Sequence, residues 1–330
     1  MSSRPHESEI VIGVDVGGTK VAAGIVDSRG KILSHTRLPM NCHGTAEEGR
    51  ASVVDAINSV LSQQPENQSR LRKIGICAPG PLDPRTGVIV NPPNVPCWRD
   101  FPLAEEISKK YSAVVRVDND ANAAGLAEHL WGAGRGYANV FYATLGTGIG
   151  TGIVLDGKIF HGRTGAAAEG GHVSIDLNGP VCNCGKKGCI EVLASGTAIA
   201  RRAREAVAQS PPSGSQLLEL AGGNATKIRC EIVGRAAEAG DPLAKEILEQ
   251  TMEYLAVWLG NTVDLLEPDV LILGGGASEM LRPYFAGIQK RMKKWCINSR
   301  YMEIPLVPAF YGEHSGIAGG AALCLSNTSF

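Results

Sequence analysis

The stretch Asp15-Val16-Gly17-Gly18-Thr19-Lys20 lies between two short, mostly apolar runs, Ile10–Val14 and Val21–Asp27. This pattern predicts a strand, a glycine-rich turn and a second strand. The same pattern returns in residues 140–156, where Gly146-Thr147-Gly148 forms the turn. The two regions align without gaps at an offset of 129 residues. This internal repeat predicts two related lobes, each with one glycine-rich hairpin.

Along the rest of the chain, candidate strands alternate with candidate helices, which is typical of an α/β fold. Asp118-Asn119-Asp120 ends one such strand and precedes a helix that runs to about Leu130. Ser210–Thr226 is rich in Gly, Pro, Ser and Asn, which predicts a surface loop. Other helices are predicted over Thr45–Gln63, Phe101–Tyr111, Ala194–Gln209, Ile228–Ala239, Pro242–Leu266 and Gly316–Leu325.

The composition excludes several classes of protein. The chain has 330 residues, of which 44% are hydrophobic and 20% charged, and its formal net charge is −1. The apolar fraction is too high and the net charge too small for a disordered chain. The charge balance gives no sequence-wide basic footprint for nucleic acid or an anionic membrane. At this length we expect two domains or lobes rather than one core.

No apolar segment reaches the roughly 18 residues that suggest a membrane span. Residues 1–9 are polar and charged, without the apolar stretch of a secretory signal. The chain has nine cysteines, three crowded together and six scattered, which is not the dense, even set of a secreted disulfide framework. We therefore expect a cytoplasmic protein with neither a membrane partner nor a nucleic-acid partner.

The strongest local signal is a cluster of one histidine and three cysteines, namely His172, Cys182, Cys184 and Cys189. One imidazole and three thiolates at this spacing suit tetrahedral zinc. Four protein ligands leave no open coordination position, so the sequence predicts a structural rather than a hydrolytic metal. Free thiols or a redox pair are the alternatives.

The glycine-rich turns are candidate phosphate sites, because successive backbone N–H groups form a concave anion site that glycine leaves open. A plain hairpin turn is the alternative for each. Neither turn is a P-loop or a dinucleotide-binding loop, since strands rather than helices follow them. Asp15, at the entrance of the first turn, either holds Mg²⁺ or caps the turn. A third glycine stretch, Gly274-Gly275-Gly276, follows a candidate strand.

Four more carboxylates are candidates for a site. Glu169 and Glu191 flank the cysteine cluster, so a bound metal would hold them near one spot. Carboxylates without neighbouring cations suit a neutral polyol, whose hydroxyls donate to them; a solvated surface pair and support of the zinc ligands are the alternatives. Asp118 and Asp120 are both eligible as a general base, and helix capping is the alternative for Asp120.

Together these features resemble the ROK family of sugar kinases and regulators. Besides the turns, the cysteine cluster and the third glycine stretch, the matching motifs are Pro79-Gly80-Pro81, Asn119-Asp120-Ala121-Asn122 and Glu169-Gly170-Gly171-His172. The resemblance implies an α/β, two-lobed, actin-like ATPase fold with a cleft between the lobes and a structural zinc knuckle. One departure is Gly170, where the family commonly has a larger apolar residue.

The resemblance implies a nucleotide site that takes ATP and Mg²⁺. It assigns the phosphates to the first two glycine turns, the adenosine to the third glycine stretch, and Mg²⁺ to the neighbourhood of Asp15. The residues that it places on ATP are Asp15, Gly17, Gly18, Thr19, Lys20, Thr144, Gly146, Thr147, Gly148, Gly274, Gly275 and Gly276.

The resemblance also implies a sugar site, in which Asp120 rather than Asp118 is the general base. The residues that it places on the sugar are Gly80, Asn94, Asn119, Asp120, Glu169, His172 and Glu191. In the family the histidine is also a zinc ligand. Zinc would thus shape the sugar pocket without touching the phosphoryl group.

The implied activity is ATP-dependent phosphorylation of a hexose, with glucose as the first choice. N-acetylmannosamine, N-acetylglucosamine and fructose are alternative substrates, polyphosphate is an alternative donor, and a non-catalytic sugar-binding regulator is the alternative of another class. The family's repressors carry an N-terminal DNA-binding domain, for which the residues before Asp15 leave no room. The family favours homodimers and homotetramers.

The expected domain organisation follows from the same resemblance. Residues 1–9 form a polar tail. Residues 10–118, together with about 315–330, form a smaller lobe. Residues 119–314 form a larger lobe that carries the zinc site.

Overall fold

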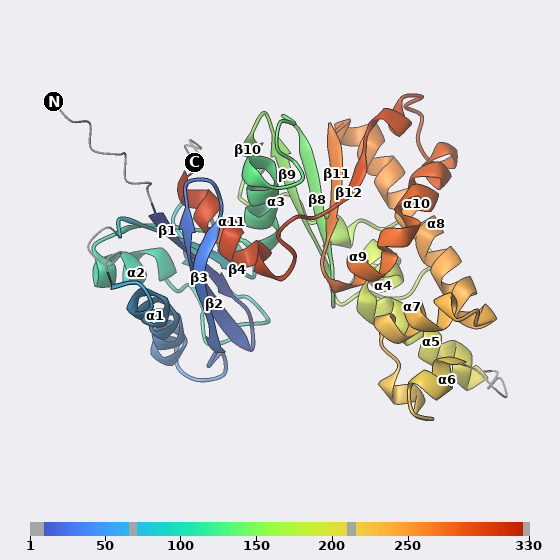
Figure 1. The fold of residues 1–330 in the computed structure, drawn as a ribbon, viewed down its shortest axis with the longest axis horizontal. Helices are drawn as coiled ribbons and strands as arrows, with labels where there is room; N and C mark the ends of the chain where they lie inside the picture. The colour runs from blue at the N-terminus through green and yellow to red at the C-terminus, as the bar shows by residue number, and fades with distance from the viewer. Residues whose placement is uncertain (1–9, 66–70, 210–215, 326–330) are drawn as a thin grey trace. The chain divides into compact units, whose positions relative to one another are not determined.

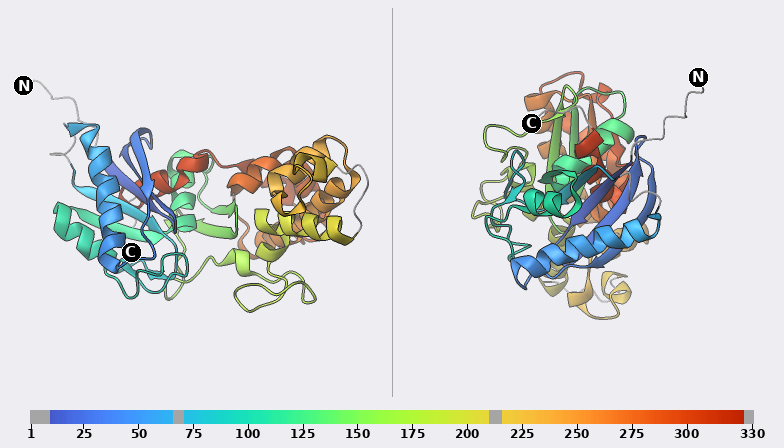
Figure 2. Two further views of the ribbon diagram at one scale, coloured as in Figure 1. Left: turned by 90° about the horizontal axis from the view of Figure 1, so that it is seen from below. Right: turned by 90° about the vertical axis from the view of Figure 1, so that its left-hand side faces the viewer.

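The structure, a computed structural model, describes residues 10–65, 71–209 and 216–325. The expected polar tail over residues 1–9 lies outside this described part. The chain divides into two compact units (Figures 1 and 2). Of the described residues, the amino-terminal unit holds 10–138, 152–168 and 311–325, and the carboxy-terminal unit holds 139–151 and 169–310.

The first sheet lies in the amino-terminal unit and has the strand order β3-β2-β1-β4-β7. The predicted hairpin is present: β1 and β2 are antiparallel, and the Gly17 N–H donates to the Lys20 carbonyl at 2.9 Å across the turn. On the other side of β1, β4 and β7 continue the sheet in parallel. The strands are β1 Ile10–Val16, β2 Lys20–Asp27, β3 Ile32–Pro39, β4 Lys73–Ala78 and β7 Val114–Asn119.

The second sheet has the order β10-β9-β8-β11-β12, which repeats the first sheet strand for strand. β9 and β10 are antiparallel, whereas β8, β11 and β12 are parallel, as in the first sheet. The Gly146 N–H donates to the Gly148 carbonyl at 2.9 Å in the second turn. The predicted internal repeat is therefore confirmed. The strands are β8 Val140–Leu145, β9 Ile149–Leu155, β10 Lys158–Ile159, β11 Val270–Gly274 and β12 Leu306–Pro308.

Helices cover both faces of the first sheet. Alternate residues of β1 point to opposite sides, so Ile12 and Val14 are buried with α1 and α2, whereas Val11 is buried with α11. α1 begins with a capping box, in which Thr45 Oγ1 accepts from the Glu48 N–H at 3.2 Å. The elements are α1 Ala46–Ser62, β5 Leu82–Asp83, β6 Val88–Ile89, α2 Leu103–Tyr111, α3 Asp120–Trp131 and α11 Ser315–Leu325.

α11 approaches β1 and β4 so closely that a side-chain carbon would not fit between them. A Cβ atom on Gly13 would lie 1.9 Å from the Ile317 carbonyl oxygen, and one on Gly75 would lie 1.7 Å from that of Gly320. Both distances are far below van der Waals contact. Part of the chain's glycine excess therefore serves helix-on-sheet packing rather than turns.

The carboxy-terminal unit is mostly helical outside its sheet. The 25-residue helix α8 begins where the sequence predicts, with Asp241 Oδ1 accepting from the Ala244 N–H at 3.0 Å. In the described residues, no helix combines the length and apolar character needed to cross a membrane. The helices are α4 Ile190–Ala194, α5 Gly196–Gln209, α6 Gln216–Leu220, α7 Cys230–Glu238, α8 Pro242–Leu266, α9 Gly276–Leu281 and α10 Phe285–Arg291.

Two of the predicted segments in this unit are wrong in part. The helix predicted over Ala194–Gln209 is divided, because Ser195 has extended backbone and its hydroxyl accepts from the Ala198 N–H at 3.1 Å. The loop predicted over Ser210–Thr226 contains α6, whose Leu217 is fully buried. Residues 210–215 of that loop lie outside the described part.

The boundaries of the two units differ from those of the expected lobes. Residues 119–138 and 152–168 were expected in the larger, carboxy-terminal lobe, yet they group with the amino-terminal unit. The reason is packing: α3 lies against α11, where Ala123 and Leu126 are buried with Ala318 and Ala322. A helix that follows the first sheet in sequence thus completes the layer that covers it.

Replacing Gly75 by alanine is expected to lower the free energy of unfolding by about 3 kcal/mol or more, because the new methyl group overlaps a backbone carbonyl. Gly287→Ala in α10 is the matched control, since the nearest atom to its Cβ is the flexible end of Arg291 at 3.2 Å. Urea unfolding of both variants measures the difference. Equal stability would contradict the close packing of α11.

Candidate active site

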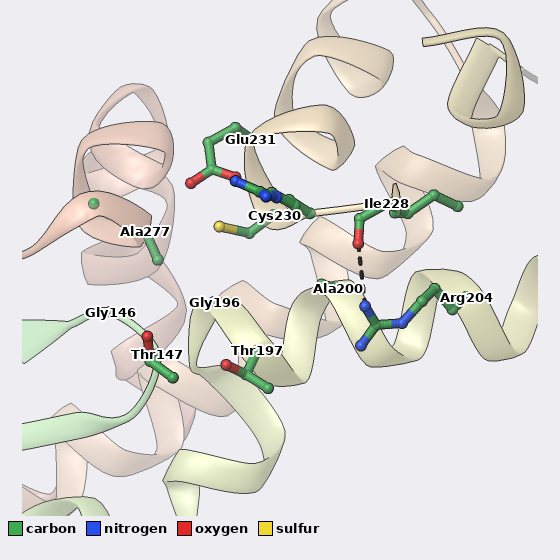
Figure 3. Close-up of a pocket in the computed structure, with 12 residues that line it drawn as sticks. Gly146, Thr147, Gly196, Thr197, Ala200, Arg204, Ile228, Cys230, Glu231 and Ala277 are labelled. Atoms are coloured by element: carbon green, nitrogen blue, oxygen red, sulfur yellow. Dashed lines mark hydrogen bonds between the residues drawn. The ribbon is translucent and has the colours of Figure 1, made fainter. Parts of the chain in front are cut away.

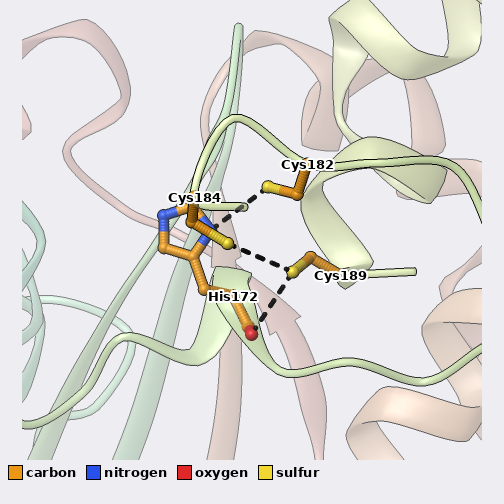
Figure 4. A group of neighbouring side chains, drawn as sticks. All are labelled: His172, Cys182, Cys184 and Cys189. Carbon is orange, nitrogen blue, oxygen red and sulfur yellow. Dashed lines mark hydrogen bonds between the residues drawn. The ribbon is translucent and has the colours of Figure 1, made fainter. Parts of the chain in front are cut away.

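One histidine and three cysteines of the carboxy-terminal unit face one another, with their four ligand atoms within 4.8 Å (Figure 4). Cys182 Sγ lies 3.6 Å from His172 Nδ1, and Cys184 Sγ lies 3.6 Å from Cys189 Sγ. Tetrahedral zinc, with Zn–S bonds of about 2.3 Å and Zn–N bonds of about 2.0 Å, requires ligand separations of roughly 3.6–3.8 Å. The predicted residues therefore fit a zinc ion.

The backbone of residues 173–189 is folded to bring these ligands together. The Cys182 N–H donates to the Lys186 carbonyl at 2.7 Å. Gly188 has a positive φ of 61°, and a Cβ atom there would lie 1.7 Å from the Asp176 carbonyl oxygen. Burial, followed by the neighbouring thiols, raises the pKa of Cys189 to about 12. A bound metal cation would stabilise the thiolate forms and so allow all three thiols to be ionised at once.

The same knuckle joins the predicted sugar-binding residues of this unit. The Ile190 N–H donates to the Val173 carbonyl at 3.0 Å, which connects α4 to the 3₁₀ turn η2, Gly170–His172. His172 presents Nδ1 to the thiols, so its Nε2 is directed away from them (Figure 4). Glu169, directly before η2, is exposed. The structure thus gathers Glu169, His172 and Glu191 on adjoining elements.

Glu191 is also tied to the second glycine turn. Its Oε2 accepts from the Ile149 N–H at 2.9 Å. A Cβ atom on Gly148 would lie 2.4 Å from that same oxygen. Gly148, which the resemblance assigned to ATP, thus leaves room for this carboxylate.

Gly170, the departure from the family pattern, has a packing explanation. Its N–H donates to Thr151 Oγ1 at 2.8 Å, and its carbonyl accepts from the buried Trp258 Nε1 at 3.1 Å. A Cβ atom at this position would lie 2.7 Å from the Thr151 hydroxyl. The Gly170 backbone, two residues before His172, is thereby hydrogen-bonded on both sides.

A pocket of about 400 Å³ opens beside the second glycine turn (Figure 3). This volume is within the range of small-molecule sites. Four stretches of chain that are distant in sequence line it. The lining residues are Gly146, Thr147, Gly196, Thr197, Ala200, Arg204, Ile228, Arg229, Cys230, Glu231, Gly276 and Ala277.

Two features of this pocket suit a phosphorylated ligand. Helices α5 and α7 begin at it, with Gly196 and Cys230, so the positive ends of their dipoles favour an anion there. Cβ atoms on Gly146 and Gly276 would meet no protein atom within 4 Å. At these two positions nothing in the described protein requires glycine, and backbone remains accessible to a ligand.

Of the lining residues, the sequence predicted Gly146, Thr147 and Gly276 and missed the others. The missed residues come from α5, from the start of α7 and the segment before it, and from α9. A helix start at Gly196 would have pointed to this pocket. The sequence analysis missed that start because it predicted one continuous helix from Ala194. Gly275 next to the pocket has a φ of 85°, and its Cβ would lie 2.5 Å from the Leu145 carbonyl oxygen.

The amino-terminal unit separates the two candidate bases. Asn119 caps α3, its Oδ1 accepting from the Ala121 N–H at 2.9 Å, so the capping interpretation of Asp120 is wrong. Asp120 is the first residue of the helix and is exposed. Asp118 is only 1% exposed, and its Oδ1 accepts from the Asn119 N–H at 2.7 Å and from Asn122 Nδ2 at 3.1 Å. Asp120 is the carboxylate that a substrate can reach.

Asp15 lies near Asp120 in the same unit. Burial and the Asp120 carboxylate raise the pKa of Asp15 to about 6, while Arg37 opposes this rise. A divalent cation would favour the ionised form of both carboxylates, so the pair fits Mg²⁺. The turn after Asp15 closes through the backbone bond from Gly17 to Lys20, so Asp15 is not needed as its cap.

The remaining predicted residues of this unit lie in the first glycine turn, at the start of β2 and on two other loops. A Cβ atom on Gly18 would lie 2.5 Å from the Asn94 carbonyl oxygen, so the glycine turn packs on the loop that carries Asn94. Asn94, Thr19 and Lys20 are exposed. Gly80 lies beside Asn119, whose Nδ2 would be 3.8 Å from a Cβ at position 80.

A sequence model of the ROK family matches residues 11–327, nearly the whole chain. The chain belongs to the ROK family. Among its relatives is a glucokinase of Streptomyces coelicolor, which is 34% identical over 315 residues, 95% of this chain and 97% of the relative. The family resemblance that the sequence motifs suggested is therefore confirmed.

Solved structures of the family resemble this one. The ROK glucokinase of Streptomyces griseus, determined in complex with glucose and AMPPNP, has a TM-score of 0.81 and 34% identity, covering 95% of this chain and 98% of that one. The predicted mixed α/β, actin-like fold is thereby confirmed. A xylose repressor of Bacillus spizizenii is 26% identical over 318 residues, 96% of this chain but 77% of the repressor. Relatives of this chain thus include both kinases and a regulator.

The zinc interpretation predicts one zinc ion per chain in the purified protein. Cys184→Ser is expected to lose the zinc and to lower the melting temperature, because three remaining ligands bind a structural ion less tightly. Elemental analysis and thermal unfolding measure the two effects. Cys296→Ser, outside the cluster, is the control and is expected to keep the metal. Wild-type protein without zinc would contradict the interpretation.

The pocket interpretation predicts different outcomes for two adjacent glycines. Gly276→Val adds a side chain in open space and is expected to weaken ATP binding about tenfold, with little change in melting temperature. Gly275→Ala is expected to destabilise the fold, because of its positive φ and its contact with Leu145. Calorimetric titration with ATP and thermal unfolding distinguish them. Unchanged ATP affinity in the valine variant would place the nucleotide elsewhere.

Proposed function

We propose that the chain is a hexokinase that transfers the γ-phosphoryl group of ATP to glucose. The observation that carries the proposal is the pair of neighbouring carboxylates Asp15 and Asp120, one partly buried and one exposed. These residues lie in a chain whose family relatives include glucokinases. A site built only to hold a sugar would not need this pair.

In the proposed reaction, Asp120 accepts the proton of the sugar 6-hydroxyl as the oxygen attacks the γ-phosphorus in line. The bond between that phosphorus and the bridging oxygen of ADP breaks. Phosphoryl transfer asks little covalent chemistry of the protein, so positioning and charge neutralisation provide most of the acceleration. Asp120 suits the base because it begins α3 with its carboxylate exposed.

The other residues bind and orient. Asn119, Asn94, Glu169, Glu191 and His172 Nε2 supply the hydrogen-bonding groups for the sugar hydroxyls. Carboxylates and amides of this kind recognise neutral hydroxyl groups by position rather than by charge. A site of this kind rejects a sugar that lacks a bonded hydroxyl more strongly than one of altered size.

The nucleotide is assigned to the glycine turns and to the pocket between α5, α7 and α9. The backbone of the two glycine turns is assigned to the phosphates, and the pocket to the adenosine. Asp15 would hold Mg²⁺, which when bound neutralises phosphate charge. Zinc bound by His172 and the three cysteines would act on the fold by fixing His172 and α4.

A coupled ADP-release assay over glucose, mannose, fructose, N-acetylglucosamine and N-acetylmannosamine tests the function. Asp120→Asn is expected to lower kcat with glucose by about 100-fold or more, because an amide cannot accept the proton. Asp55→Asn, exposed on α1, is the matched control and is expected to retain wild-type kcat. An Asp120→Asn enzyme with more than about a tenth of wild-type kcat would contradict the base assignment.

The same assay separates the substrates. Turnover with an N-acetylated sugar but not with glucose would move the function to amino-sugar phosphorylation and leave the mechanism in place. Turnover with polyphosphate in place of ATP would change the donor. No turnover with any sugar in zinc-replete protein would overturn the proposal in favour of a sugar-binding regulator.

A further inference from the structure

A histidine and a buried aspartate form a close pair behind the proposed base. His161 Nε2 lies 2.6 Å from Asp118 Oδ2. Asp118 is at the end of β7 and 1% exposed, and His161 follows β10 in the same unit. An ionised carboxylate only accepts hydrogen bonds, so Nε2 is the donor in this pair.

The two oxygens of Asp118 bond in different directions. Oδ2 faces His161, whereas Oδ1 accepts from the Asn119 N–H at 2.7 Å and from Asn122 Nδ2 at 3.1 Å. Asn119 caps α3, and Asn122 lies in its first turn. Asp118 therefore connects the loop after β10 to the start of the helix that carries Asp120.

A buried carboxylate is stable only while its hydrogen-bonding partners are present. Without the imidazole, Asp118 Oδ2 loses a partner 2.6 Å away and is left buried without that hydrogen bond. A carboxylate that turns to find another partner weakens its hold on Asn119 and Asn122. Asp120 is bonded directly to Asn119 along the chain, so its carboxylate moves with that segment.

We infer that His161 and Asp118 are a positioning pair that fixes Asp120 for proton acceptance, an inference that rests on the proposed function. Neither residue touches the reacting atoms. Displacing a reacting group by about 1 Å costs up to about 100-fold in rate, so the pair acts on kcat through the placement of Asp120. ATP binding, which uses the glycine turns and the pocket, does not depend on it.

Three variants of His161 test the inference. His161→Ala removes the donor. His161→Gln keeps an amide N–H near the position of Nε2, whereas His161→Asn is too short to place one there. Lys158→Ala, exposed in β10 of the same hairpin, is the matched control. The kcat with the preferred hexose and the KM values for hexose and ATP are measured for each, at a temperature where circular dichroism shows folded protein.

The expected result is a kcat at least about tenfold lower for His161→Ala and His161→Asn, with KM for ATP within about twofold of wild type. His161→Gln is expected to recover kcat to within about threefold, and Lys158→Ala to be unchanged. The glutamine–asparagine comparison stays informative even where the alanine variant does not fold, because both replacements are polar amides.

Three outcomes would overturn the inference. A His161→Asn enzyme with kcat within twofold of wild type, while Asp120→Asn is inactive, removes the pair from catalysis and leaves the proposed function standing. Equal losses in the glutamine and asparagine variants would mean that the donor is not what matters. Wild-type protein that phosphorylates no hexose overturns the proposed function, and this inference with it.

Discussion

The close contact of α11 with β1 and β4 is the constraint on which the amino-terminal unit depends. Glycines at the crossing let the helix backbone approach the sheet, and one of them also shapes the site. A Cβ atom on Gly316 would lie 2.2 Å from the Asp15 carboxyl carbon, and the Cys77 thiol donates to the Gly316 carbonyl at 3.1 Å. The helix therefore buries Asp15 against the sheet, and that burial is the main cause of its raised pKa. The contact of α11 with the sheet thus explains both the close packing and the raised pKa of Asp15.

The two sheets have the same strand order but support their glycine turns differently. The first turn packs through Gly18 on the loop of Asn94, whereas the second is held by the Glu191 carboxylate at the end of the knuckle. The knuckle has little core of its own, since Leu177 is 84% and Val181 66% exposed. A metal ion stabilises such a short segment where apolar burial cannot. Zinc would thus hold Glu191 in position, and the Glu191 carboxylate would keep the second glycine turn ordered.

Local patterns made much of this predictable. The two hairpins, α8 and the zinc ligands depend on residues close in sequence, and each has a recognisable signature. The pocket depends on Gly196 and Cys230, whose approach to Gly146 is decided by tertiary packing and leaves no local pattern. Residue types alone also could not separate Asp118 from Asp120, because burial and hydrogen bonding distinguish them. The need for glycine at position 75 arises from a helix far away in the chain, which no local pattern reveals.

The hydrogen bond between Cys77 and Gly316 spans 239 residues of sequence. At ribosomal rates of about 5–20 residues per second, the residues of α11 emerge roughly 12–50 seconds after β4. During that interval, the face of the first sheet that carries Val11, Ala22 and Val26 lacks α11. The intervening unit has its own sheet and helices before α11 exists. The strands that are synthesised first are thus among the last to be enclosed. Until α11 is synthesised, the nascent chain presents an apolar sheet surface to chaperones.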